Sequence, residues 1–299
     1  MSHIATLISN PAEPAVDDAL LRKLSHMTPG AGPARILNPG IAADLPFEAG
    51  DIPGHGDFLA TLRDELAGLP VDLFVQKAEG RRKRLLLADM DSTMIGQECI
   101  DELAAEVGVK EHIAAITERA MRGEIAFEPA LRERVSVFKG LPVAAIQRVI
   151  DQRITLTPGG RTLVQTMKAD GARCALVSGG FTHFTGAISK MIGFDENHAN
   201  TLETDGDMLA CTLHEPILGK DAKLGHLKRL TAEVGLDPSQ TMAVGDGAND
   251  LAMIQASGLG VAFHAKPAVA VQADARIDHG DLTALLYLQG YGVDEFTID

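Results

Sequence analysis

Short apolar segments alternate with helical patterns along much of the chain, and this alternation constrains the fold more than any other feature. The apolar run Leu85-Leu86-Leu87-Ala88 is uninterrupted, which is typical of a parallel strand that helices cover on both faces. Further strands are expected at 172–177, 241–244 and 259–263, with helices between them. The sequence therefore predicts an α/β fold, a doubly wound, Rossmann-like parallel sheet with helices on both sides.

A helical insertion follows the first of these strands. Residues 97–157 contain four helical segments; in the first, apolar residues recur at i, i+3, i+4 and i+7 from Ile100, and Gly108 ends the pattern. Pro129 lies near the start of the third, a position that proline favours. Further along, Asp205-Gly206 is a hairpin signal. We expect a helical unit inserted into the α/β domain.

Residues 1–80 differ in pattern from the rest, because they are rich in Pro, Gly and Ala and mix short apolar runs with two helical patterns. We expect a separate small α+β domain with the order β-α-β-(β)-α-β. Its expected strands are 3–9, 34–40 and 71–77, and its expected helices are 17–24 and 56–69. The basic run at 81–84 is interpreted as a solvated linker into a second domain, 81–299.

The charge and composition of the chain exclude several classes of partner. With 27 Lys and Arg against 41 Asp and Glu, the formal net charge is −14, so the broad basic surface of a protein that binds nucleic acid or anionic membranes is absent. Cys99, Cys174 and Cys211 lie far apart without metal-ligand spacing, which is typical of a reduced, cytoplasmic protein. No membrane span or signal peptide is expected. A small-molecule partner fits this composition, and a homodimer stays open.

Three of the expected strands end in polar segments. Asp89 and Asp91 follow the first, Ser178 and two glycines follow the second, and the loop GDGAND at 245–250 follows the third. In open α/β sheets ligands bind at the carboxyl ends of the strands, so these segments are expected to meet. Carboxylates gathered there would repel one another unless a cation lay between them, and oxygen ligands suit Mg²⁺. Taken alone, an Asp-x-Asp pair is more typical of a capped turn.

Two further features suit an anionic ligand such as phosphate. Ser178 offers a hydroxyl, and the glycines after it let backbone N–H groups approach an anion closely. Lys223 lies near the start of an expected helix, where a cation opposes the helix dipole, so a ligand would explain its position. Taken alone, the first feature is more typical of a flexible turn and the second of a surface lysine.

In order and context, these segments resemble the signature of the haloacid-dehalogenase superfamily of phosphohydrolases. That signature consists here of DMDST at 89–93, SGG at 178–180, Lys223 and GDGAND at 245–250. Within the superfamily the chain is similar to the phosphoserine phosphatase family. This similarity rests on Glu98, on FEPALRERVSVFKGLP at 127–142 and on AVGDGANDLAMI at 243–254. The resemblance covers residues 84–290. Relatives often carry an ACT-like regulatory domain ahead of it, which residues 1–80 match only loosely.

The resemblance implies a Mg²⁺-dependent hydrolysis of O-phospho-L-serine to L-serine and phosphate, the last step of serine biosynthesis. Asp89 would be the nucleophile that forms an aspartyl-phosphate, and Asp91 would protonate the departing seryl oxygen and later activate water. Mg²⁺ would be held by Asp89, the backbone carbonyl of Asp91 and Asp246. Asp250 would support this metal site from behind the ligands.

The same resemblance implies which residues bind the phosphate. Ser178, Gly179 and Lys223 would hold the phosphoryl oxygens, and Asn249 would help to orient the substrate. A protein of net charge −14 would then bind an anion through a local cation and backbone dipoles.

The helical insertion 97–157 is similar to the cap of this superfamily, which closes over the site and excludes water. From the cap, Glu98 would accept the substrate ammonium and Arg134 would bind its carboxylate, a task that suits the planar guanidinium. Met121 and Phe127 would line the closed pocket or belong to the core of the cap.

Two alternative functions stay open at this point. The same fold could serve a phosphotransferase that passes the phosphoryl group to an alcohol, or a phosphatase for another small phosphomonoester. A phospho-acceptor signalling domain also places an Asp and an acidic Mg²⁺ pocket at strand ends, although it would need neither the proton shuttle Asp91 nor the inserted cap.

Overall fold

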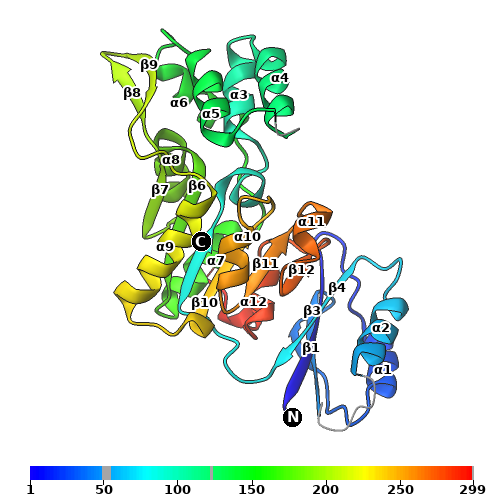
Figure 1. Ribbon diagram of the computed structural model, residues 1–299. Helices are drawn as coiled ribbons and strands as arrows, with labels where there is room; N and C mark the ends of the chain where they lie inside the picture. Colours follow the sequence, from blue (N-terminus) through cyan, green and yellow to red (C-terminus); the bar gives the residue numbers. More distant parts are fainter. Residues whose placement is uncertain (49–54, 122–123, 298–299) are drawn as a thin grey trace.

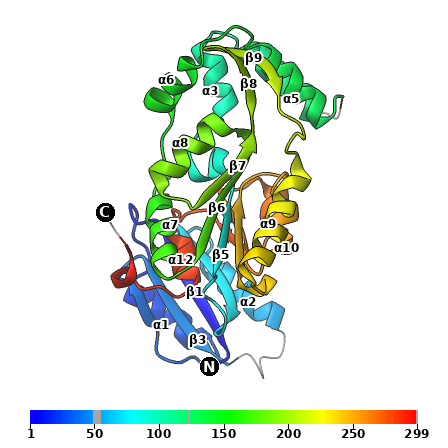
Figure 2. The ribbon, with the colours of Figure 1, turned by 90° about the vertical axis from the view of Figure 1, so that its left-hand side faces the viewer.

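The computed structural model describes residues 1–48, 55–121 and 124–297. Their strands form a four-stranded sheet, a six-stranded sheet and a two-stranded hairpin. Figures 1 and 2 show the six-stranded sheet in the middle of the molecule, with a helical cap at one end and the four-stranded sheet at the other. Among the described residues, no helix combines the length and the apolar character that a membrane span requires.

The N-terminal unit is an antiparallel sheet of order β2-β3-β1-β4 with two helices, in the element order that the sequence predicted. Its elements are β1 (His3–Ser9), α1 (Asp18–Met27), β2 (Arg35–Asn38), β3 (Ala42–Phe47), α2 (His55–Glu65) and β4 (Val71–Lys77). Asp17 caps the N-terminus of α1, because its carboxylate accepts a hydrogen bond from the Leu20 N–H at 2.8 Å. Leu21 and Leu24 of α1 pack with Leu7 and Leu45 of the sheet, so one face of the sheet is closed by helices.

The central sheet is parallel throughout, with the order β12-β11-β10-β5-β6-β7. Its strands are β5 (Leu85–Ala88), β6 (Arg173–Phe181), β7 (Glu196–Asn200), β10 (Thr241–Gly245), β11 (Gly260–Phe263) and β12 (Ala275–Ile277). Helices α7 (Gly160–Ala169), α8 (Thr182–Ile192) and α12 (Ala284–Leu288) contribute to one apolar core, while α9 (Lys220–Val234), α10 (Leu251–Ala256) and α11 (Pro267–Ala270) contribute to the other.

Strand β5 shows how one short sequence serves both cores. Leu85 and Leu87 pack with α9, α10 and α11, whereas Leu86 and Ala88 pack with α7, α8 and α12, because successive side chains of a strand point to opposite faces. All four residues of the strand are buried. The predicted doubly wound α/β fold is confirmed. One detail was wrong: Ser178 and the two glycines, which were expected to follow the strand at 172–177, belong to β6 itself.

The cap consists of four helices and a hairpin. Its elements are α3 (Cys99–Glu106), α4 (Lys110–Met121), α5 (Phe127–Ser136), α6 (Ala144–Arg153), β8 (Leu202–Asp205) and β9 (Met208–Leu213). The predicted helical insertion is therefore present, and the predicted hairpin turns at Gly206, where φ is +59°. Although the hairpin is distant in sequence, it joins the cap: the Leu209 N–H donates to the Leu141 carbonyl at 2.8 Å, and the Gly140 N–H donates to the Leu209 carbonyl at 3.1 Å.

The interpretation of residues 81–84 as a solvated linker is wrong for Arg81 and Lys83, although Arg82 and Arg84 are exposed. Arg81 is buried between β3 and α12, where its guanidinium donates to Asp44 at 2.6 and 2.9 Å and to the carbonyls of Tyr287 and Leu288. Lys83 is also buried, and its ammonium donates to the carbonyls of Gly80 and Ser239. Charged side chains are exposed unless the folded protein offers them hydrogen-bonding partners. Most of the partners of Arg81 and Lys83 lie far away in sequence, so the local run of charges did not reveal them.

A second buried acid, Asp72 on β4, links the N-terminal unit to the rest. Its carboxylate accepts hydrogen bonds from the backbone N–H groups of Asp278 at 2.8 Å, His279 at 3.1 Å and Gly280 at 2.8 Å. Asp72 is 6% exposed, so these three donors replace the water that its carboxylate would otherwise bind. The turn 278–280 is thereby fixed to the N-terminal unit.

Candidate active site

The carboxyl ends of β5, β6 and β10 open into one pocket beneath the cap. Because β5 lies between β6 and β10 in the sheet, the polar segments that follow these strands are neighbours. The pocket has a volume of about 200 Å³. It is lined by Asp89, Asp91, Glu98, Ile100, Leu131, Arg134, Ser178, Gly179, Gly180, Phe181, Asp246, Gly247, Asn249 and Lys266. Of the predicted site residues, Lys223 and Asp250 do not line it and lie behind the others.

A tight turn over Met90–Met94 places both acids of the DMDST segment at the pocket. The Ile95 N–H donates to the Met90 carbonyl at 3.1 Å, and Ser92 has a φ of +54°, a left-handed conformation that is rare for serine. The Asp89 carboxylate accepts from the Met90 N–H at 2.8 Å, and the Asp91 carboxylate accepts from the Cys99 N–H at 3.1 Å. The turn therefore fixes the direction of two carboxylates that are two residues apart.

Lys223 lies between two of the acids. Its ammonium is 2.6 Å from Asp89 Oδ1 and 2.5 Å from Asp250 Oδ1, and all three side chains are buried. Burial raises the pKa of Asp89, and the Lys223 ammonium opposes that rise; the two carboxylates in turn raise the pKa of Lys223 above its ordinary value. The unfavourable helix position of Lys223 is thus explained by two carboxylates of the protein.

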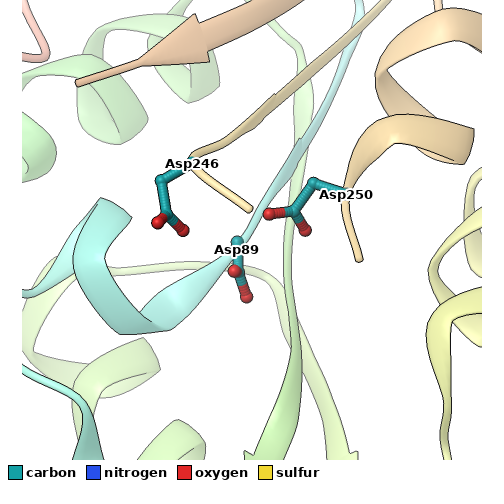
Figure 3. A group of neighbouring side chains, drawn as sticks. All are labelled: Asp89, Asp246 and Asp250. Carbon is teal, nitrogen blue, oxygen red and sulfur yellow. The ribbon is translucent and has the colours of Figure 1, made fainter. Parts of the chain in front are cut away.

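Three carboxylates form a cluster that could hold a metal ion. Oxygens of Asp89, Asp246 and Asp250 all lie within 4.8 Å of one another, and Figure 3 shows Asp89 at the end of β5 facing Asp246 and Asp250, which both come from the loop after β10. Both oxygens of Asp250 already accept hydrogen bonds, one from Lys223 and one from the Gly247 N–H at 3.1 Å. Within the described part of the chain no hydrogen bond or ion pair engages the Asp246 carboxylate. An oxygen-only donor set fits Mg²⁺: Asp246 and the second carboxylate oxygen of Asp89 would bind it, because Asp89 Oδ1 already contacts the Met90 N–H and Lys223, and Asp250 lies behind them.

Asp91 has the environment of a general acid. Burial, and then the negative charge of Glu98, raise the pKa of Asp91 to about 6. A carboxyl group that titrates near neutral pH can both donate and accept a proton during a reaction.

The end of β6 forms the opposite wall of the pocket. Ser178 is 2% exposed, and its hydroxyl oxygen accepts from the Gly180 N–H at 2.9 Å. A Cβ at Gly180 would lie 3.1 Å from Ser178 Oγ and 3.3 Å from Asp91 Oδ2, so only glycine leaves this space open. Sequence reasoning missed Asn200, a buried side chain that donates to the Gly179 carbonyl at 2.9 Å and so fixes this wall. A single asparagine in a polar segment offered no signal.

The cap contributes charges from the other side. Glu98 accepts from the Ser92 hydroxyl at 2.8 Å, and Arg134 on α5 is half-buried and lines the same pocket. The structure therefore brings the predicted ammonium-binding and carboxylate-binding residues to one site, although their roles stay predictions. The side chains of Met121 and Phe127, which we expected to line the closed pocket, lie outside the described residues.

Lys266 is a second residue that sequence reasoning missed. It follows β11, lines the pocket and donates its backbone N–H to the Asp246 carbonyl at 3.2 Å. The rule that ligands bind beyond the carboxyl ends of strands would have pointed to this loop, because β11 is the neighbour of β10.

Comparison with known proteins assigns this arrangement to a family. The family model described as haloacid dehalogenase-like hydrolase matches residues 86–255, which include both acids of DMDST, Ser178, Lys223 and Asp246. The chain belongs to the haloacid dehalogenase-like hydrolases. The predicted family is confirmed.

Individual relatives of this haloacid dehalogenase-like hydrolase carry a more specific name. A probable phosphoserine phosphatase from Schizosaccharomyces pombe is 45% identical over 216 residues, which make up 72% of this chain and 72% of that protein. A HAD family hydrolase from Salmonella enterica serovar Typhi matches 96% of this chain and 97% of its own, with a TM-score of 0.85 and 30% identity. A substrate-bound phosphoserine phosphatase matches 69% of this chain and 98% of its own, with a TM-score of 0.63 and 38% identity.

Proposed function

We propose that this haloacid dehalogenase-like hydrolase hydrolyses O-phospho-L-serine to L-serine and phosphate. The observation that carries the proposal is the composition of the pocket. The carboxylates of Asp89 and Asp91 face a cap that supplies one negative side chain, Glu98, and one positive side chain, Arg134. A phosphomonoester whose alcohol bears both an ammonium and a carboxylate complements these two charges. The names of the relatives support the same substrate.

The reaction would proceed in two displacements at phosphorus. A carboxylate oxygen of Asp89 attacks the phosphorus atom, the bond from phosphorus to the seryl oxygen breaks, and Asp91 gives its proton to that oxygen. Asp91 then takes a proton from water as the water oxygen attacks the aspartyl-phosphate, which releases phosphate and restores Asp89.

The other residues of the site would bind and orient. Ser178 and the N–H groups near Gly179 would hold phosphoryl oxygens, with Asn249 beside them, while Lys223 keeps a positive charge next to the nucleophile. Mg²⁺ bound at Asp89 and Asp246 would supply further neutralisation of the phosphoryl charge. Glu98 and Arg134 would select the leaving group.

A phosphate-release screen over small phosphomonoesters, with Mg²⁺ and with a chelator, tests this proposal. We expect phosphoserine to give the highest kcat/KM and the chelator to abolish turnover. Phosphoethanolamine lacks the carboxylate and phosphoglycolate lacks the ammonium, so each should be a poorer substrate. Equal rates for all three compounds would refute phosphoserine as the preferred substrate. Turnover that persists in the presence of the chelator would refute the dependence on a metal ion. Addition of an acceptor alcohol such as homoserine distinguishes a phosphotransferase, which would form the phosphorylated alcohol.

A further inference from the structure

Lys266 places a positive charge at the rim of the pocket, and the reaction described above gives it no role. It lies at the start of α11 and lines the pocket beside Asp246. Its side chain is exposed; within residues 1–48, 55–121 and 124–297 no hydrogen bond or ion pair engages its ammonium, although its positive charge favours the ionised form of the nearby Asp246 carboxylate. By contrast, Lys223 is buried between Asp89 and Asp250 and does not line the pocket. The charge of Lys266 is therefore available to a ligand.

An anionic substrate needs such a charge, because carboxylates crowd the pocket. Asp89, Asp91, Glu98 and Asp246 all line it, and the chain as a whole carries a formal charge of −14. A dianion that approaches this rim is repelled unless a cation compensates locally. By Coulomb's law in water, a unit positive charge about 6 Å from a dianion strengthens binding of that dianion roughly tenfold at low ionic strength. One exposed lysine is therefore enough to change substrate affinity measurably.

The loop that carries Lys266 is held in a fixed conformation. His264 has a φ of +44°, and the other non-glycine residue with positive φ in the described chain is Ser92, in the turn of the nucleophile. The His264 N–H donates to the Ile277 carbonyl at 2.8 Å, and its ring Nε2 donates to the Gly280 carbonyl at 2.9 Å. Such a conformation persists only where the surroundings hold it, and it is concentrated at functional sites. Here it fixes the loop against Asp246.

We propose that Lys266 captures the phosphate group of the substrate, so that it acts on binding and leaves the chemical step unchanged. Its position beside Asp246, at the phosphate end of the pocket, separates it from Arg134, which faces the pocket from the cap. The ligand class is therefore the phosphomonoester dianion, whatever the alcohol. This inference rests on the proposed phosphatase function and adds a binding residue to it.

The test compares Lys266→Gln with Lys228→Gln in the full chain. Lys228 is an exposed lysine of α9 that does not line the pocket, so its variant removes the same charge at a distance. For Lys266→Gln we expect kcat/KM to fall about 5- to 10-fold at low ionic strength through KM, with kcat nearly unchanged. At about 0.5 M salt the loss should shrink to less than about twofold, since screening removes the attraction. Lys228→Gln should stay near wild type, and Lys266→Arg should retain most of the affinity.

Two substrates make the outcomes distinct. Phosphoserine and p-nitrophenyl phosphate share the phosphate dianion, so Lys266→Gln should affect both equally. Equal kinetics of the two glutamine variants would overturn the proposal, and so would a loss confined to phosphoserine or a loss in kcat alone. Failure of the proposed function would be seen separately, in a wild-type enzyme that hydrolyses the aryl phosphate and leaves phosphoserine intact.

Discussion

Asp89 and Asp91 are two residues apart, yet their surroundings differ in kind. Asp89 has an ammonium 2.6 Å away, which favours its ionised form against the effect of burial. Asp91 has the negative charge of Glu98 as its neighbour, which favours the protonated form. Burial raises the pKa of both carboxyl groups; the ammonium in contact with Asp89 opposes that rise, whereas the charge of Glu98 adds to it at Asp91, and this difference suits a nucleophile and a general acid.

Replacement of Asp89, the proposed nucleophile, gives the first prediction. Asp89→Asn should lower kcat for phosphoserine by at least about 1,000-fold, because an amide oxygen is a poor nucleophile and the metal site loses a charge. Phosphate release measures this loss. Asp18→Asn removes an exposed carboxylate of α1 and should leave the rate unchanged. Activity of Asp89→Asn within about tenfold of wild type would contradict the covalent role.

For Asp91, the proposed general acid, the expectation is different. Asp91→Asn lacks the base for the second displacement, so phosphoenzyme should accumulate when the leaving group needs no acid. Mixing the variant with p-nitrophenyl phosphate should give a burst of about one p-nitrophenol per protein and a trapped phosphorylated chain in mass spectrometry. Steady turnover without a burst would argue against this role.

In the proposed mechanism, Arg134 selects an amino-acid phosphate by binding its carboxylate. Loss of one partner of a buried charge pair costs about 2–5 kcal/mol, so Arg134→Ala should lower kcat/KM for phosphoserine by roughly 30- to 4,000-fold. Arg134→Lys should restore little, since an ammonium cannot make the two-pronged contact. Hydrolysis of p-nitrophenyl phosphate should change much less. Equal losses on both substrates would show that Arg134 serves cap folding or closure.

At the scale of elements, the sequence patterns predicted the central strands, which are buried on both faces of the sheet, but not the strands at the two edges of the sheet. Strand β5 was predicted because all of its side chains are apolar, whereas β7 and β12 were missed. Both lie at the edges of the central sheet, where one side lacks a neighbour; β7 reads ENHAN and β12 has three residues. Edge strands need less apolar sequence, so periodicity cannot distinguish them from loops.

The same limit applies to the site. The acids of DMDST and GDGAND were predictable because they follow strands directly, but Asn200 and Lys266 gain their positions from contacts across the sheet. The burial of Arg81 likewise depends on Asp44, which is 37 residues away. Partners of this kind become visible only when the chain is folded, since a local pattern carries no information on distant residues.

At the scale of the molecule, we propose that residues 1–80 form a separate small α+β domain that is firmly joined to the phosphatase domain, 81–299. The hydrogen bonds from Arg81 to Asp44 and from Gly280 to Asp72 connect them, and Ile8 and Ala42 of the first sheet belong to the same apolar core as Tyr287. A chain that begins at Arg81 keeps every residue of the pocket but exposes this apolar surface. We expect it to catalyse per folded molecule and to aggregate more readily than the full chain.

The pair Asp44–Arg81 tests that junction without truncation. Asp44→Ala leaves a buried guanidinium without its carboxylate, so the free energy of unfolding should fall by about 3–5 kcal/mol in urea denaturation. Glu233→Ala breaks the exposed pair with Arg229 on α9 and should change it by less than about 1 kcal/mol. Similar values for both variants would mean that the junction contributes little to stability.

The cap is built from two separate stretches of chain, so the backbone passes between the cap and the central sheet four times. These passages form two paired ribbons: Ile95 lies against Leu156, with the Gly96 N–H donating to the Thr155 carbonyl at 3.1 Å, and the His214 N–H donates to the Thr201 carbonyl at 3.0 Å. A cap joined to the sheet by one connection could rotate in several directions. Two separate connections restrict the rotation of the cap to the axis that passes through both of them. Opening and closing would therefore return Glu98 and Arg134 to the same place over Asp89 in every cycle.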